Sequence, residues 1–223
     1  MLKSQSLVSV VQHDGVTRES VGAILEGAGY RVRTFSTARD FLAQMQFPGP
    51  SCVVVEFDLP DGGLPIPEAL QEAGRSDQVV FISHRACLQS CVSAMRAGAI
   101  DFLATPFGGS TLFQAVDRAL ERSAALRSEY EDRASARFRI SSLTRREFSV
   151  LKLLLEGIPN KDIGARLGVA EGTIKIHRRN VMEKIRAKSL VDIVLLAQRS
   201  GIPFPDAEFT YVSRGQTMQL PAK

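Results

Sequence analysis

Cys52-Val-Val-Val-Glu-Phe57 is an apolar run with the length of a single β-strand. Four further runs of this kind lie around it, at residues 7–11, 30–35, 78–82 and 100–104. All of them are continuous rather than alternating, which is typical of strands that are covered on both faces. Helix-like segments separate them. The pattern therefore predicts an α/β domain with a doubly wound, parallel, five-stranded sheet over residues 1–122.

The helix-like segments have residues that are typical of helix ends. Ser36 and Ser110 occupy expected N-cap positions, and Gly29 and Gly98 occupy expected C-terminal ends. Sheets of this kind bind ligands at the carboxyl ends of their strands. The residues that follow the strands at this edge therefore form a candidate site: Gln12, His13, Glu56, Ser83 and Thr105.

The last helix of the sheet domain continues into a polar stretch. Residues 123–139 contain neither Gly nor Pro. We predict a helical linker over residues 123–140.

A purely helical pattern follows the linker. Thr144-Arg-Arg-Glu147 has the spacing of a capping box, which marks the start of a helix. Asn160 is expected to cap a short helix that Gly168 ends. Two more helices are expected, from Glu171 to about Ala187 and from Ser189 to Arg199. Short helices joined by a Gly-containing turn indicate a helix-turn-helix. We predict a small all-α domain over residues 141–200 and an irregular tail over residues 201–223.

The composition excludes several classes of protein. Hydrophobic residues make up 44% and charged residues 23% of the chain, as in globular proteins and unlike disordered ones. No apolar run reaches the roughly 18 residues of a membrane helix, and the polar N-terminus is not typical of a secretory signal. Three cysteines do not make a disulfide framework, so we expect a reducing, cytoplasmic location.

The charge is divided unevenly along the chain. Residues 1–136 have 12 Lys and Arg against 16 Asp and Glu, a net charge of −4. Residues 137–199 have 14 against 6, a net charge of +8. A basic segment beside an acidic one favours a nucleic-acid-binding module attached to a different domain.

The helix expected from Glu171 separates apolar from basic residues. Three residues are expected to pack inward: Ile174, Val181 and Ile185. Lys175, Ile176 and Arg179 lie roughly opposite. An exposed Ile between basic residues suits DNA, where it can touch a thymine methyl group while Lys or Arg binds guanine. The alternative is a solvated basic helix of an ordinary bundle, and the helix-turn-helix spacing favours DNA over it.

These segments closely resemble the LuxR-type (GerE-type) DNA-binding domain over about residues 141–199. The resemblance rests on Leu143-Thr-Arg-Arg-Glu-Phe-Ser-Val-Leu151, Gly157-Ile-Pro-Asn-Lys-Asp-Ile163 and Gly172-Thr-Ile-Lys-Ile-His-Arg-Arg-Asn180. It implies that the helix from Glu171 lies in the major groove of double-stranded DNA. Lys175, Ile176 and Arg179 match the family's base-contacting positions.

The resemblance also implies roles for neighbouring residues. Arg178 flanks the base-contacting positions, and the residues placed for phosphate contacts or internal support are Asn160, Lys161, Thr173 and His177. We expect His177 to pack within the domain, because no partners at metal-ligand spacing accompany it.

Two residues depart from the family pattern. Ala170 replaces the usual Ser cap, a loss of about 1 kcal/mol. Gly164 replaces the usual mid-helix Ala, which costs about 0.5–1 kcal/mol.

The N-terminal half resembles a response-regulator receiver of the FixJ/NarL group, a flavodoxin-like fold, over about residues 7–122. The motifs are Val10-Val-Gln-His-Asp14, Val54-Val-Glu-Phe-Asp-Leu-Pro60, Phe81-Ile-Ser83, Ala94-Met-Arg-Ala-Gly-Ala99 and Asp101-Phe-Leu-Ala-Thr-Pro-Phe107. The family belongs to two-component systems, in which a sensor kinase supplies a phosphoryl group.

The resemblance shows that the receiver chemistry is incomplete. Gln12 and His13 fill the positions of the two Mg²⁺-binding acids, Glu56 that of the phosphoacceptor Asp, and Thr105 that of the Lys. Only Ser83 matches. Loss of these carboxylates removes ligands that Mg²⁺ requires, and loss of the Lys removes a counter-charge for the phosphoryl oxygens. We therefore predict an atypical receiver without an aspartyl-phosphate switch.

Three interpretations of Glu56 remain open. Glu56 is hydrogen-bonded to Ser83, Thr105 or His13 in a relic pocket, or its carboxylate imitates a phosphorylated Asp. Alternatively, the pocket receives a new input, such as a small ligand, a proton on His13 or a partner protein. Asp14 and Asp58 are the nearest spare carboxylates, but their positions fit a metal site poorly.

Cys87 and Cys91 lie four residues apart on one expected helix. This spacing rarely suits a disulfide. We expect two small residues packed under the helix rather than a redox pair.

Together these features predict a sequence-specific transcription regulator that acts independently of phosphorylation, without enzymatic activity, metal or cofactor. We expect a homodimer on a two-fold operator. The alternative is a protein-interaction or heterodimerising regulator, whose receiver-like half docks a partner or senses a ligand.

Overall fold

The computed structural model describes residues 5–63, 65–201, 211–213 and 216–218, and the chain divides into two compact units, Met1–Ser128 and Glu129–Lys223. The strands are β1 (Leu7–Val11), β2 (Arg31–Phe35), β3 (Ser51–Glu56), β4 (Gln78–Ser83), β5 (Asp101–Ala104), β6 (Tyr211–Ser213) and β7 (Gln216–Met218). The helices are α1 (Gly15–Gly27), α2 (Ala38–Leu42), α3 (Ile66–Glu72), α4 (Leu88–Arg96), α5 (Gly109–Ser141), α6 (Arg145–Leu155), α7 (Asn160–Leu167), α8 (Glu171–Ile185) and α9 (Leu190–Ser200). No helix in the described part of the chain is long and apolar enough to cross a membrane.

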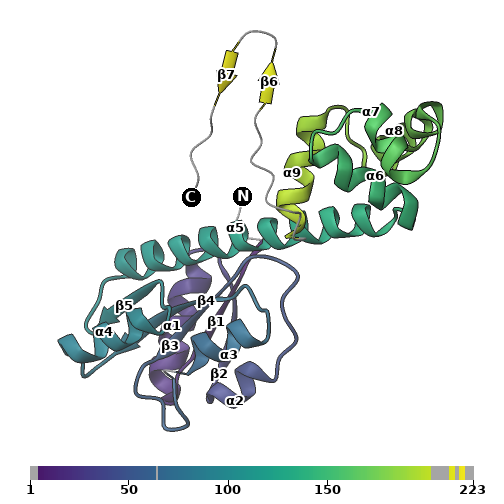
Figure 1. Ribbon diagram of the computed structural model, residues 1–223. Helices are drawn as coiled ribbons and strands as arrows, with labels where there is room; N and C mark the ends of the chain where they lie inside the picture. The colour runs from purple at the N-terminus through teal and green to yellow at the C-terminus, as the bar shows by residue number, and fades with distance from the viewer. Residues whose placement is uncertain (1–4, 64, 202–210, 214–215, 219–223) are drawn as a thin grey trace. The chain divides into compact units, whose positions relative to one another are not determined.

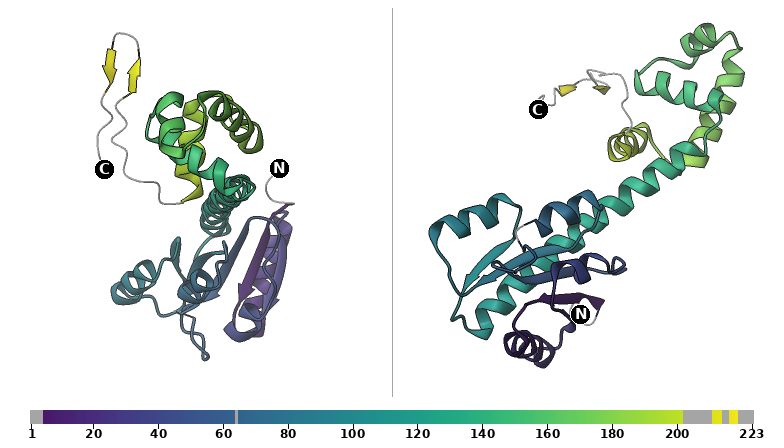
Figure 2. Two further views of the ribbon diagram at one scale, coloured as in Figure 1. Left: turned by 45° about the vertical axis from the view of Figure 1, so that its right-hand side comes forward. Right: turned by 90° about the horizontal axis from the view of Figure 1, so that it is seen from below.

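The first unit contains a five-stranded parallel sheet with the order β2-β1-β3-β4-β5 (Figure 1). Helices cover both faces (Figure 2), since α1 and α5 pack on one hydrophobic cluster of the sheet and α2, α3 and α4 on the other. The continuous apolar runs of β1 and β3 are buried on both faces, as their pattern predicts. The predicted doubly wound, flavodoxin-like α/β fold is confirmed.

Two of the predicted helix caps are wrong. Helix α2 is capped by Thr37 rather than Ser36, because Thr37 has an extended backbone and its side chain accepts a hydrogen bond from the Asp40 N–H at 3.1 Å. Helix α5 begins at Gly109, so Ser110 lies inside it rather than at its cap. Gly29 and Gly98 do lie at helix ends, with the positive φ angles that favour glycine.

Helix α5 is continuous from Gly109 to Ser141, so the predicted linker is helical. The part of α5 up to Ser128 belongs to the first unit, so this unit extends past the expected boundary at residue 122. The Ser51 N–H donates to the Ser123 hydroxyl at 3.0 Å, and the Arg127 guanidinium donates to the Phe47 and Pro48 carbonyls.

The second unit packs α6, α7, α8 and α9 around two small apolar clusters, as the all-α prediction expects. The capping box is confirmed, since Thr144 and Glu147 cap each other's backbone N–H at the start of α6. The predicted Asn160 cap is wrong. Pro159 holds the cap position of α7 with an extended backbone, and the Asn160 side chain accepts a hydrogen bond from Arg178 instead.

The irregular tail is also wrong where the structure describes it. Residues 211–213 and 216–218 pair as an antiparallel two-stranded sheet. The sequence signal is an aromatic and β-branched pair, Tyr211 and Val212, which is typical of a strand.

Candidate nucleic-acid interface and receiver site

The inner face of α8 fixes its position in the second unit. Ile174, Val181 and Ile185 are buried, as their spacing predicts, against clusters that include residues of α6, α7 and α9. This packing determines which residues of α8 point away from the unit.

The exposed face of α8 presents Lys175, Ile176 and Arg179 to solvent. Ile176 is 53% exposed, although its side chain is apolar. Lys175 Nζ lies 3.0 Å from Glu171 Oε1, one turn earlier on the helix. This ion pair is not among the features predicted from the sequence. Its usual sequence signal, an acidic residue four positions before a Lys on a helix, is present.

The other expected DNA-contacting residues divide into two groups. Thr173 and Lys161 are exposed near the starts of α8 and α7. Asn160, His177 and Arg178 are partly buried, and Arg178 Nη1 donates to Asn160 Oδ1 at 3.4 Å. This contact joins the two helices of the helix-turn-helix.

Glu147 forms the main polar contact between α6 and α8. Its carboxylate accepts hydrogen bonds from Thr144 and, at 2.7 Å, from Lys184 Nζ. Burial raises the pKa of Glu147, but the hydrogen bonds from Lys184 and Thr144 outweigh it, so the pKa lies below its ordinary value. Lys184 is therefore held by a buried carboxylate.

The turn before α8 explains the two departures from the family pattern. Ala170 has the extended backbone of an N-cap but makes no side-chain cap, as predicted. A Cβ atom at Gly164 would lie 2.7 Å from the Val169 carbonyl oxygen. The missing side chain of Gly164 thus lets the backbone of the turn at Val169 pack closely against α7. The stability cost expected from the low helix propensity of glycine is therefore not its whole effect on the domain.

In the receiver unit, the candidate residues do lie along the carboxyl edge of the sheet. Glu56 Oε2 accepts a hydrogen bond from the His13 backbone N–H at 3.2 Å. This agrees with one of the three contacts expected for a relic pocket. Gln12 is buried, and neither polar atom of its side chain has a hydrogen-bond partner among the described residues.

Ser83 and Thr105 have other partners. Ser83 Oγ donates to Asp58 Oδ2 at 3.2 Å. Thr105 Oγ1 lies 2.8 Å from His84 Nδ1 and donates to the Ser83 carbonyl at 3.2 Å. The Thr105–Pro106 peptide bond is cis, as the family pattern implies.

The donor set does not fit the Mg²⁺ that a receiver binds. Asp14 caps α1 by accepting from the Thr17 N–H at 2.7 Å, and hydrogen bonds from Thr17 hold its pKa below the ordinary value. Asp58 is bonded to Ser83, and the positions of the two metal-binding acids hold an amide and an imidazole. Among the described residues, no group of three or more His, Cys, Asp or Glu is placed so that it could hold a metal ion.

The interpretation of the cysteines is wrong for Cys87. It is exposed and caps α4, with its Sγ accepting from the Ser90 N–H at 3.4 Å, so it does not pack under the helix. Cys91 is partly buried one turn further on, and both thiols are free.

An α/β sheet unit followed by a helix-turn-helix with an exposed basic strip defines the class of two-domain DNA-binding regulators. Residues 8–117 match the response regulator receiver domain, and residues 141–197 match the family described as bacterial regulatory proteins, luxR family.

Relatives match the chain over nearly its whole length. Nodulation protein W of Bradyrhizobium diazoefficiens is 34% identical over 210 residues, which cover 94% of this chain and 92% of that protein. Transcriptional regulatory protein FixJ of Azorhizobium caulinodans is 33% identical over 202 residues, which cover 90% and 96%. The solved structure of response regulator StyR is 35% identical, with a TM-score of 0.79, and covers 87% of this chain and 98% of that one.

The chain therefore belongs to the response regulators that carry a LuxR-family helix-turn-helix, as the motifs predict. It is a response-regulator transcription factor with a DNA-binding domain.

Proposed function

We propose that this protein binds specific double-stranded DNA sequences through α8 and regulates transcription independently of aspartyl phosphorylation, without acting as an enzyme. The exposed Ile176 between Lys175 and Arg179 is the observation that carries the DNA-reading part of the proposal. Basic side chains bind guanine O6 and N7, and an apolar side chain contacts a thymine methyl group.

The DNA-reading role is tested by variants of the full chain. Genome-wide mapping of bound DNA supplies the fragments, and fluorescence anisotropy gives their dissociation constants. Because each base-reading side chain contributes about 1–3 kcal/mol, Lys175→Ala and Arg179→Ala should each weaken binding by about 5- to 150-fold.

Arg133→Ala is the matched control, since Arg133 is an exposed cation of α5. It should leave the affinity within about twofold. The DNA-reading role is wrong if the chain binds no promoter fragment, or if the α8 variants behave like the control.

Phosphorylation independence is supported by the residues at the sheet edge. An amide, an imidazole and a Thr replace two acids and a Lys, and Glu56 is one methylene longer than Asp. This displaces the carboxylate by roughly 1.5 Å, enough to spoil in-line attack. We expect no covalent phosphoryl group after incubation with acetyl phosphate and Mg²⁺, as measured by intact-protein mass. A gain of one phosphoryl group at Glu56, Asp58 or Asp61 would overturn this part of the proposal.

Two of the three interpretations of Glu56 differ in what its replacement does to the map of bound DNA. The bond to the His13 N–H favours a relic pocket, in which Glu56→Ala and Glu56→Asp leave the map of bound DNA unchanged. If Glu56 imitates a phosphorylated Asp, both variants should lose bound sites together.

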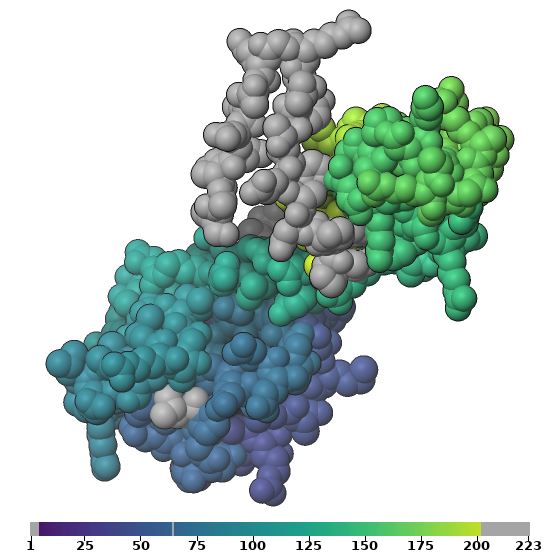
Figure 3. Space-filling view, in the orientation of Figure 1, coloured from purple at the N-terminus to yellow at the C-terminus, as the bar shows by residue number. Residues whose placement is uncertain are grey.

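We also propose that the protein acts as a homodimer. Leu88 and Met95 are seven residues apart on α4, and their side chains are 82% and 48% exposed. Helix α4 lies at the surface of its unit (Figure 3). An exposed apolar strip of this kind favours association. A dimer predicts paired half-sites in the bound DNA.

A further inference from the structure

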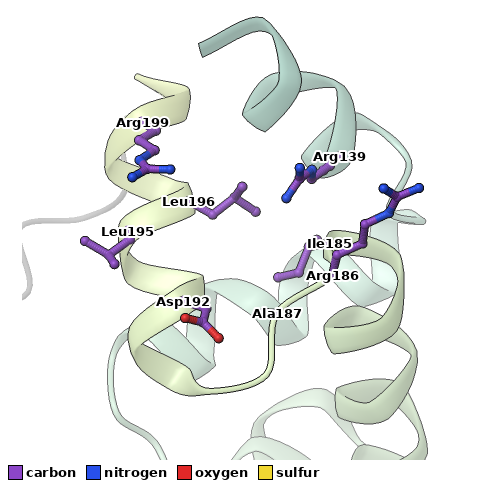
Figure 4. A pocket seen from close by; sticks show the side chains of 8 residues that line it. All are labelled: Arg139, Ile185, Arg186, Ala187, Asp192, Leu195, Leu196 and Arg199. Atoms are coloured by element: carbon purple, nitrogen blue, oxygen red, sulfur yellow. The ribbon is translucent and has the colours of Figure 1, made fainter. Parts of the chain in front are cut away.

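The second unit contains a cleft between the end of α5, the end of α8 and α9. It lies toward the opposite end of α8 from Lys175 and Ile176. It has a volume of about 310 Å³. Its lining residues are Arg139, Ile185, Arg186, Ala187, Asp192, Leu195, Leu196 and Arg199. Figure 4 shows Leu196 pointing from α9 into the space that Arg139 faces from α5.

The cleft is strongly cationic. Three arginines line it, and none of them has an ion-pair partner among the described residues. The one carboxylate, Asp192, already accepts hydrogen bonds from the Lys188 and Ser189 N–H groups at 2.8 and 2.9 Å. Like charges gathered around one cleft repel each other, and a bound anion would relieve that repulsion.

The cleft also has an apolar side. Ile185 is buried, and Ala187 and Leu196 are partly buried. Binding sites for small molecules combine apolar walls with a few charged groups, and they begin at about 300 Å³. The lining thus suits a ligand with an apolar part and an anionic part.

Arg186 has a backbone conformation that an arginine rarely adopts. It ends α8 with a φ of +56°, and no other non-glycine among the described residues has a positive φ. Gly168 and Gly201 hold the equivalent left-handed positions after α7 and α9. The arginine costs about 1 kcal/mol or more at this position, and such backbone outliers are often found at functional sites.

We propose that this cleft binds a small organic anion, in which an apolar group of about one ring carries a phosphate or a carboxylate. Guanidinium groups bind both anions through paired N–H donors. Ten residues separate Ile176 from Arg186, or about 15 Å along the helix axis. DNA read by the start of α8 therefore leaves the cleft to a free anion.

Calorimetric titration of the full chain tests the site with three probes: phenyl phosphate, inorganic phosphate and phenol. Phenyl phosphate should bind one saturable site at least tenfold more tightly than either of the others. The double variant Arg139→Gln/Arg199→Gln should weaken it at least tenfold. Arg133→Gln, an exposed cation elsewhere on α5, should not change it.

A competition experiment with DNA distinguishes a free small anion from the phosphates of bound DNA. Bound promoter DNA should leave the affinity for phenyl phosphate within twofold, whereas displacement by DNA would make the cleft a DNA-phosphate contact and overturn the proposal. It is equally overturned if phenyl phosphate does not bind, or if the double variant binds it normally with an unchanged circular dichroism spectrum. The titrations without DNA test the cleft even if the proposed DNA binding fails.

Discussion

At the scale of single residues, Glu147 does more than its place in a capping box requires. The residue is 4% exposed, and its carboxylate accepts hydrogen bonds both from Thr144 and from Lys184. It therefore fixes the start of α6 and, through Lys184, the later half of α8. A buried carboxylate is stable only when such donors surround it.

Glu147→Gln should lower the free energy of unfolding at pH 7 by about 1–3 kcal/mol, because an amide cannot accept these charge-assisted bonds equally well. In the folded state the Glu147 pKa lies below its ordinary 4.5. Its stabilising effect is therefore complete above about pH 5 and disappears as the pH falls through the folded pKa. Urea unfolding at several pH values should show the two proteins converging as the pH falls below 4.5 and through the lowered pKa of folded Glu147.

Glu156→Gln is the control for this prediction. Glu156 pairs with Arg166 at 3.4 Å on the surface, and exposed pairs contribute about 0–1 kcal/mol. An equal loss in both variants would mean that the buried contact has no special role.

At the scale of elements, the start of α8 in the helix-turn-helix lacks a side-chain cap. Ala170 has the φ and ψ of an N-cap, −64° and 148°, but no side-chain acceptor. Ala170→Ser should therefore stabilise the protein by about 1 kcal/mol, because the hydroxyl would satisfy a free N–H of the first turn. Thermal unfolding measures the gain.

Ala165→Ser is a matched exchange at an exposed position inside α7. It should destabilise slightly, since Ser forms helices less readily than Ala. If both exchanges have the same sign, the missing cap is not the cause.

The sequence predicts the elements better than their ends. Strands with continuous apolar runs and the Thr144 capping box are distinctive, and the structure confirms them. Ser36 and Thr37 are adjacent hydroxyl residues, and only the backbone conformation decides which one caps α2. Asn160 follows a proline, and Pro159 takes the cap position of α7 because its backbone is already extended.

At the candidate site, the sequence predicts which side chains lie together better than it predicts their hydrogen-bond partners. The motifs place Gln12, Glu56, Ser83 and Thr105 at one sheet edge and offer Glu56 three possible partners, but they do not choose among them. Glu56 is bonded to the backbone N–H of His13, and a residue pattern does not identify a backbone donor. The sequence does not reveal that Lys184 pairs with Glu147, because the two residues lie 37 positions apart in the chain.

At the scale of the whole molecule, the two halves differ in charge. Residues 1–136 have a net charge of −4 and residues 137–199 a net charge of +8. Cations that neutralise DNA phosphates release condensed counterions, so the affinity of such a segment depends on salt. The acidic half contributes no such release.

DNA affinity should therefore fall steeply with salt. If about six phosphates are neutralised, binding should weaken about 10³-fold between 50 and 200 mM salt. Lys161→Gln should reduce the slope of log K against log salt by about one per bound chain, because Lys161 is an exposed cation near the start of α7. Arg133→Gln should leave the slope unchanged. Anisotropy titrations at four salt concentrations measure these slopes, and a flat response for the unmodified chain would contradict phosphate-directed binding by the basic half.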